Sequence, residues 1–206
     1  MAKLALNKSA LNRERKNLEA YRRFLPSLEL KQRQLTALRE KARREAARSA
    51  KELQRRQDEV AASLPMLASD MFDLSGMVAV EEVKVRSENA VGVELPRLDD
   101  VRFRVQSYSL LGEPHWVDAA IEGLREVLEL RIRNQMAERR LELLEDAVRK
   151  ITQRVNLFTE VLIPRAEDNI RKISIYLGDL ERAAVIRAKI AKKKRGVDRR
   201  EQGAAP

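Results

Sequence analysis

Few residues of this chain have side chains that could do chemistry. Its one histidine, His115, stands next to its one tryptophan, Trp116, at the predicted start of a helix. An imidazole there could act in acid–base catalysis, and an indole could stack on a ligand. Two carboxylate pairs, Glu81-Glu82 and Asp99-Asp100, could also exchange protons with a substrate. The run Lys192–Arg195 could bind nucleic acid or a membrane surface.

Each of these residues also has an ordinary structural explanation, which we favour. A histidine at a helix start can cap the helix, and the tryptophan can anchor the preceding loop to the helix. Paired carboxylates are common as solvated charge in turns and edge strands, and lysines at a helix end suit the helix dipole. The sequence contains no GxxxxGK[ST], GxGxxG, GxSxG or HExxH motif.

Composition narrows the functional classes further. The 206 residues include no Cys, which excludes disulfides, thiol nucleophiles and cysteine-ligated metals. A single His excludes sites that need two imidazoles. We therefore expect a non-catalytic chain with no cofactor and no bound metal. No apolar run approaches the ~20 residues of a membrane span, and the N-terminus has no signal-peptide core, so we expect a cytoplasmic protein without membrane insertion.

Charge and chain breakers divide the sequence into parts. The chain carries 42 Lys and Arg against 32 Asp and Glu, a net charge of +10, and only 4% aromatic residues. This balance is typical of long helices or coiled coils. Gly and Pro concentrate between residues 65 and 114. We predict an N-terminal helix over 1–64, a central segment over 65–114, a C-terminal helix over 115–195 and a disordered tail over 196–206.

The first part holds one heptad phase for about nine repeats, as a coiled coil does. Apolar residues fill its a positions at Leu4, Leu11, Leu18, Leu25, Ala46, Leu53 and Val60, and its d positions at Tyr21, Leu28, Leu35 and Ala42. Gln32, Arg39 and Arg56 also fall at core positions, and small residues dominate from Ala42 to Ala50. We therefore expect the interface between the helices to bury little apolar area there. Asn7 or Ser9 could cap the helix, although Leu4 on the seam favours an earlier start.

The last part repeats this pattern. Apolar residues keep 3–4 spacing at Leu141, Leu144, Val148, Ile151, Val155, Phe158 and Leu162, and again at Ile170, Ile173, Leu177, Leu180 and Ala184. The step from Leu162 to Ile170 is one residue longer than a heptad and coincides with Pro164. We expect the helix to bend and to change its supercoil there.

The central segment changes to a period of two. Val101, Phe103 and Val105 alternate with polar residues, which predicts a half-buried strand. Val78–Val80 and Val83–Val85 alternate out of phase with each other, which predicts a bulge between them. Residues 89–95 could form a further short strand. The fold class is therefore mainly α: a long antiparallel two-helix coiled coil with a small β-hairpin, or a three-stranded ribbon, in the central segment.

The C-terminal helix also resembles a known family. Gln153-Arg154-Val155-Asn156, the run Val161–Arg165 with Ile163-Pro164-Arg165, and the ending Lys192-Lys193-Lys194 are similar to the C-terminal helix of the D subunit of V-type and A-type rotary ATPases. Asn7–Ser9 and Arg23–Lys31 resemble bacterial members of that family. The resemblance covers both helices.

This resemblance implies a central-stalk rotor shaft without chemistry of its own. Its implied partners are the catalytic and nucleotide-binding subunits of the hexamer, the small F subunit of the central stalk and a funnel-shaped subunit on the membrane ring. Its rotation would couple ATP synthesis or hydrolysis to H⁺ or Na⁺ transport on the cytoplasmic side of a membrane. The implied partner-interface residues are Arg154, Asn156, Ile163, Pro164, Arg165, Lys192, Lys193 and Lys194.

Two other classes stay open from the residues alone. A basic coiled coil could bind nucleic acid or an anionic surface, although residues 187–200 offer no aromatic side chain for stacking on bases, so we expect no direct nucleic-acid binding. A self-assembling cytoskeletal coiled coil would also fit the heptads, but the charged core positions argue against it.

Overall fold

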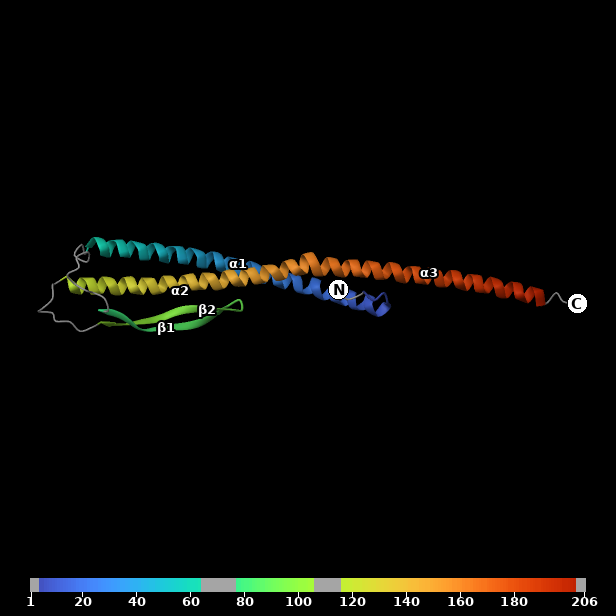
Figure 1. Cartoon of the computed structure of the whole chain (residues 1–206), viewed down its shortest axis with the longest axis horizontal. Coiled ribbons are helices and arrows are strands. Elements are labelled where there is room, and N and C mark those ends of the chain that lie inside the picture. The colour runs from blue at the N-terminus through green and yellow to red at the C-terminus, as the bar shows by residue number, and fades with distance from the viewer. Residues whose placement is uncertain (1–3, 64–76, 106–115, 203–206) are drawn as a thin grey trace. The chain divides into compact units, whose positions relative to one another are not determined.

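The computed structural model describes the backbone of residues 4–63, 77–105 and 116–202, and the side chains of these ranges up to residue 193. Its elements follow the order α1 (Lys8–Ser63), β1 (Val78–Ala90), β2 (Val93–Val105), α2 (Val117–Asn156), the π-helix η2 (Leu157–Leu162) and α3 (Ile163–Gln202) (Figure 1). Two long helical runs with an antiparallel hairpin between them in sequence confirm the predicted fold class.

The first helix begins at a side-chain cap. The backbone N–H of Ala10 donates to the Asn7 side-chain oxygen over 2.7 Å, which supplies a partner that the first turn of a helix lacks. Asn7 is therefore the N-cap, as one of the two predicted candidates. The earlier start favoured by Leu4 is wrong, because residues 4–6 are not helical.

The chain divides into two compact units, each built on an antiparallel helix pair. The first contains residues 1–29 and 153–206. Its apolar core joins Ala10 and Leu11 of α1 to Ile173 of α3, and Leu4, Ile170 and Leu177 pack against this cluster. The predicted a position at Leu11 and the stripe position at Ile173 are both buried.

The second unit contains residues 30–152. Leu35, Ala42, Ala46 and Val60 of α1 are buried, as are Leu144, Val148 and Ile151 of α2. Gln32 donates to the Thr152 hydroxyl over 3.0 Å, whereas Arg56 pairs with Glu126. The earlier residue of α1 thus contacts the later residue of α2, and the later residue contacts the earlier one, so the two helices are antiparallel. Gln32 and Arg56, at predicted core positions, thus find partners on the facing helix, whereas Arg39 pairs with Glu40 on its own helix.

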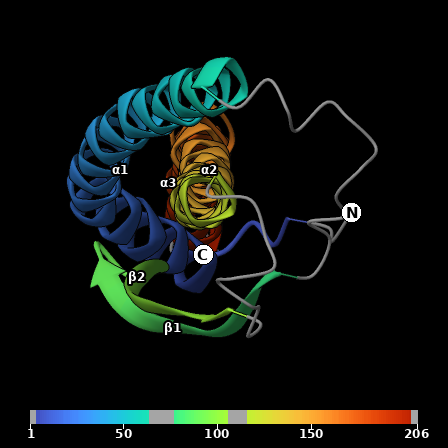
Figure 2. The same ribbon diagram turned by 90° about the vertical axis from the view of Figure 1, so that its left-hand side faces the viewer.

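The hairpin of the second unit is a two-stranded twisted ribbon (Figure 2). Its register shifts between Val80 and Glu82, which confirms the predicted bulge, and again between Lys84 and Val85, where β2 carries the extra residue Asp99. The three-stranded alternative is wrong for the described residues, because the sheet there has two strands.

Residues 89–95 contain the hairpin turn and do not form a strand of their own. Val91 and Gly92 between the strands have φ values of 54° and 77°, as in a type I′ turn. The Gly92 N–H donates to the Asn89 side-chain oxygen over 3.0 Å. Glycine adopts this conformation freely, whereas the β-branched Val91 is strained in it. The prediction of a third short strand here was wrong because this turn contains a valine at a position that normally takes Asn, Asp or Gly.

The last helix extends past the predicted boundary. The backbone of α3 is helical as far as Gln202, beyond residue 195 where we expected the helix to end. The side chains beyond Lys193 lie outside the described residues, as does the backbone of 203–206. The division of the chain into four segments stays a prediction.

Candidate partner-binding site

Five of the residues implied as a partner interface flank the π-helix η2 of the first unit. Arg154 and Asn156 end α2, and Ile163, Pro164 and Arg165 begin α3. Ile163 is half-buried and the other four are exposed or partly exposed. The structure therefore places these five residues in one short stretch of helix and leaves most of them accessible to a partner.

The π-helix has a direct cause in the sequence. The Ile163 N–H donates to the Phe158 carbonyl, five residues earlier, which is the hydrogen bond of a π-helix. Proline at 164 has no N–H to offer the Glu160 carbonyl, and its ring clashes with that carbonyl in a regular α-helix. A wider turn just before the proline relieves the clash. It also absorbs the extra residue in the apolar stripe.

The π-helix leaves part of its apolar surface in solvent. Phe158 packs edge-on against Tyr21 of α1, with ring centroids 5.5 Å apart. Leu157 and Val161, in contrast, are 46% and 47% exposed. The site thus combines two exposed aliphatic side chains with the guanidinium groups of Arg154 and Arg165. Such a mixture suits a protein-binding surface, because arginine is enriched at interfaces and their buried centres are apolar.

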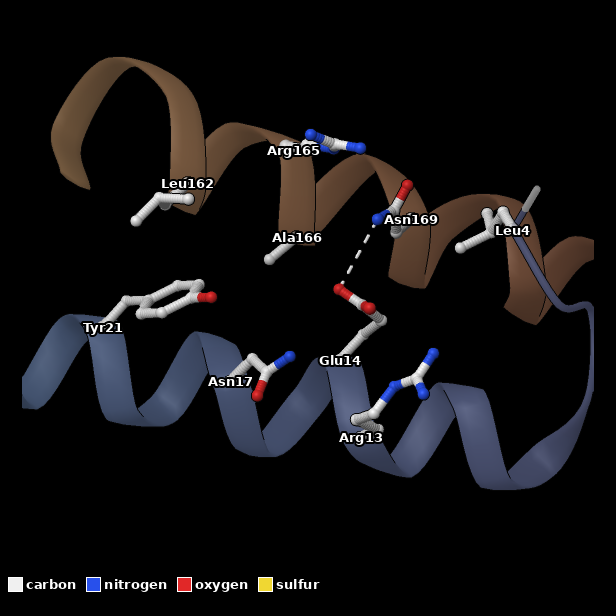
Figure 3. Close-up of a pocket in the computed structure, with 9 residues that line it drawn as sticks. All are labelled: Leu4, Arg13, Glu14, Asn17, Tyr21, Leu162, Arg165, Ala166 and Asn169. Atoms are coloured by element: carbon white, nitrogen blue, oxygen red, sulfur yellow. Dashed lines mark hydrogen bonds between the residues drawn. The ribbon is translucent and has the colours of Figure 1, made fainter. Parts of the chain in front are cut away.

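A cleft of about 260 Å³ opens beside Arg165 in the same unit. Figure 3 shows Glu14 extending from α1 toward Asn169 of α3, and the Asn169 amide lies 3.5 Å from the Glu14 carboxylate. Ala166, on the same helix as Asn169, presents only a methyl group and leaves room in the cleft. The lining residues are Leu4, Arg13, Glu14, Asn17, Tyr21, Leu162, Arg165, Ala166 and Asn169. Among the described residues, the lining has no imidazole, thiol or paired carboxylates, and its amides and opposite charges suit water or a partner side chain.

The three implied lysines lie elsewhere on α3. Lys192 and Lys193 are exposed, and the Lys194 side chain lies outside the described residues. At 1.5 Å per residue, Lys192 is about 40 Å along the helix from Arg165. Arg154–Arg165 and Lys192–Lys194 are therefore two separate surfaces rather than one site.

Three of the four paired carboxylates of the hairpin form ion pairs with arginines. Asp99 pairs with Arg86 over 2.7 Å, whereas Arg102 lies 3.4 Å from Glu82 and 3.7 Å from Asp100. Acid–base work by these carboxylates finds no support in this arrangement. Glu81 is the bulged residue of β1. Trp116 packs against the buried pair Val60 and Ala120, which fits its predicted anchoring role, while His115 lies outside the described residues.

Two arginines that sequence reasoning missed hold the hairpin on α2. Arg140 donates to the Pro96 carbonyl over 3.2 Å and lies 3.7 Å from Glu88. Arg125 stacks on the Phe103 ring at 5.6 Å. Leu95 of β2 is 2% exposed. The arginines of α2 have no distinctive local pattern, so no sequence signal could have identified these two.

Shifted pKa values in the second unit reflect structural ion pairs. A hydrogen bond from Arg39, assisted by the charges of Arg43 and Arg44, lowers the pKa of Glu40. Hydrogen bonds to Glu59 and Glu126 raise the pKa of Arg56. Both shifts favour the charged form at neutral pH, unlike those of a group poised to exchange protons. Among the described residues, no cluster of His, Cys, Asp or Glu could hold a metal ion.

Comparison with known proteins now identifies the family. The family model for the D subunit of ATP synthase matches residues 10–193. This chain belongs to the ATP synthase D-subunit family. The V-type ATP synthase D subunit of Borreliella burgdorferi is 37% identical over 193 residues, which cover 93% of this chain and 95% of that protein. The protein of the same name from Chlamydia muridarum is 35% identical over 198 residues, covering 94% and 96%.

Membership supports a role as an accessory subunit of a rotary ATPase, and the processes of ATP synthesis and ion transport follow from the family. No helix within the described residues is both long enough and apolar enough to cross a membrane.

Proposed function

We propose that this chain is the central-stalk rotor shaft of a V/A-type ATPase. In this role it transmits torque between the catalytic hexamer and the ion-translocating membrane ring, and it couples ATP synthesis or hydrolysis to H⁺ or Na⁺ transport. The observation that carries the proposal is the family match over residues 10–193. An antiparallel helix pair in each unit supports it, because a shaft needs stiffness and no chemistry of its own.

The partners follow from the same role. The catalytic and nucleotide-binding subunits surround the shaft, the small F subunit binds its side, and a funnel-shaped subunit receives its lower end on the cytoplasmic side of the membrane. Arg154, Asn156, Ile163, Pro164 and Arg165 form one contact surface, and Lys192, Lys193 and Lys194 form another. Exposed Leu157 and Val161 support the first surface, since they add apolar contact area beside its arginines.

A rotation experiment tests the shaft directly. The chain has no Cys, so one introduced cysteine is a unique attachment point. Glu145→Cys, at an exposed position of α2, carries a bead in a complex whose hexamer is fixed to glass. We expect the bead to rotate in one direction on addition of ATP. Continued hydrolysis with a stationary bead that is still attached would refute the shaft role.

A matched pair of variants tests the contact surface. Replacing Arg154 and Arg165 with Ala removes two guanidinium groups beside the π-helix. Replacing Arg139 and Arg149 removes two that form ion pairs with acids on their own helix. We expect the first pair to lower the amount of the chain retained in the complex and the second to leave it unchanged. Equal retention of both variants in the complex would show that Arg154 and Arg165 do not contribute to the interface.

A further inference from the structure

A row of cations follows the outer face of α1 in the second unit. Arg33, Arg44, Arg48 and Lys51 are all exposed, and we call them the cationic ladder. Their spacing of eleven, four and three residues returns to the same side of an α-helix. Buried Leu35, Ala42 and Ala46 of the same segment occupy the opposite side, which faces α2. The ladder extends along the helix for about 27 Å.

This chain neutralises the ladder only in part, because Arg44 attracts Glu40 four residues earlier. None of its four cations forms an ion pair within the described ranges, whereas Arg133, Arg139 and Arg149 of α2 each pair with an acid one turn away on their own helix. Arg44 and Arg48 stand four residues apart, a spacing at which like charges repel and destabilise a helix. The isolated chain therefore bears a repulsion that an external anion would relieve.

The surrounding sequence increases the local positive charge. Residues 31–56 contain ten Lys and Arg against three Glu. The lowered pKa of Glu40 reports the same field, because Arg43 and Arg44 contribute to it after the hydrogen bond from Arg39. Exposed charge of this density attracts an anionic partner over distances of about a Debye length, some 8 Å at physiological salt.

The shape of this face indicates which anion fits. Ala37 and Ala47 are exposed beside the ladder, and their small side chains let a partner backbone come close. No aromatic residue occurs between residues 33 and 51 to stack on nucleic-acid bases. We propose that the cationic ladder docks an acidic segment of a neighbouring protein subunit of the complex. This inference rests on the proposed function and adds to it the chemistry of one partner.

Site-directed crosslinking in the assembled complex identifies the occupant. Ala47→Cys carries a benzophenone maleimide next to Arg44 and Arg48, and Glu145→Cys carries the same probe on α2 as the control. We expect the Ala47 adduct to contain a peptide of another subunit rich in Asp and Glu, and the Glu145 adduct to lack it. An assembled complex whose Ala47 adduct contains only neutral or basic peptides would overturn the proposal.

Charge variants measure the contribution of the ladder to binding. The test variant carries Arg44→Gln, Arg48→Gln and Lys51→Gln. The control, Arg133→Gln, Arg139→Gln and Arg149→Gln, changes the net charge equally on α2. We expect the test variant to bind the remaining complex about tenfold or more weakly and with a flatter salt dependence, and the control to match the wild type. Circular dichroism verifies that both variants fold.

The alternative outcomes are distinguishable. If the wild-type chain assembles and the two variants bind equally well, the ladder inference fails and the shaft proposal stands. If the wild-type chain does not assemble at all, both fail together. If the chain retains duplex DNA or RNA at about 0.15 M salt and the ladder variant loses it, nucleic acid replaces the acidic protein segment as the occupant.

Discussion

The contact between Gly123 of α2 and Val60 of α1 offers a sharp test of the packing in the second unit. A Cβ added at Gly123 would lie 3.1 Å and 3.3 Å from the two methyl groups of Val60, closer than ordinary van der Waals contact. Val60 is buried, and a β-branched side chain in a helix has one strongly preferred χ1 rotamer, so it cannot move aside easily.

Gly123→Ala therefore combines two opposed effects. Alanine stabilises a helix interior by about 1 kcal/mol relative to glycine, while overpacking a filled site costs about 1 to 3 kcal/mol. We expect the clash to dominate and to lower the free energy of unfolding by about 1 kcal/mol. Gly178→Ala is the matched control, because its Cβ would meet only the Arg182 side chain at 4.0 Å. That variant should gain up to about 1 kcal/mol from helix propensity.

A double-mutant cycle isolates the contact itself. Val60→Ala alone should cost about 2 kcal/mol by leaving a cavity. Combined with Gly123→Ala, it should cost less than the sum of the two, with a coupling of about 1 to 2 kcal/mol, since the new methyl group fills the space. Urea unfolding followed by circular dichroism measures each free energy. If Gly123→Ala stabilises the chain as much as Gly178→Ala does, the close approach of the two helices is absent and the reasoning is refuted.

Three further predictions concern single residues. Val91→Asn should stabilise the hairpin by about 0.5 to 1 kcal/mol, because Asn accepts the positive φ that strains valine. Slower amide hydrogen exchange in β1 and β2 would measure this gain. Faster exchange would contradict the prediction. Asn7→Ala should cost about 1 kcal/mol of stability by removing the N-cap, with Asn12→Ala as an exposed control on the same helix. Glu40 should titrate below an ordinary glutamate by NMR, and Arg39→Gln should raise its midpoint. The pKa of Glu40 is lower in the folded state than in the unfolded state. The stabilisation from this carboxylate is therefore present above its unfolded-state pKa and is lost as the pH falls through its folded-state pKa. An unchanged titration midpoint in Arg39→Gln would contradict the Arg39–Glu40 pairing.

The buried side of each helix was predictable, because the period of an α-helix brings apolar residues at heptad spacing onto one side. Leu11, Leu35 and Val60 fall on the heptad positions and are buried. How the seam tolerates Gln32 and Arg56 was not predictable. Their partners, Thr152 and Glu126, belong to the facing helix, and Gln32 is 120 residues from its partner along the chain. The relative register of two helices is set by packing, which no local pattern contains.

The hairpin was predicted only in part from the sequence. The change of phase between Val80 and Val83 predicted a bulge between the two runs, because a bulge returns the second apolar run to the face of the first; the register places it at Glu81. The turn was missed because Val91, Gly92 and Val93 look like part of a strand by composition. Asn89 and Gly92, which share a hydrogen bond, were the available signal. The candidate interface around the π-helix, in contrast, came from resemblance, and its individual residues remain a proposal.

The break in the C-terminal stripe shows how one residue type can reshape a surface. The sequence predicted a disturbance at Pro164, whereas the widened turn covers Leu157–Leu162 just before it. Proline disturbs the carbonyls of the preceding turn rather than its own position, so the structural change appears N-terminal to the residue that causes it. The buried stripe then continues through Ala166, which is 2% exposed. Leu157 and Val161 lie off this stripe and are exposed to solvent, close in sequence to Arg154. The proposed contact surface of Arg154–Arg165 therefore coincides with the stretch of helix that Pro164 alters.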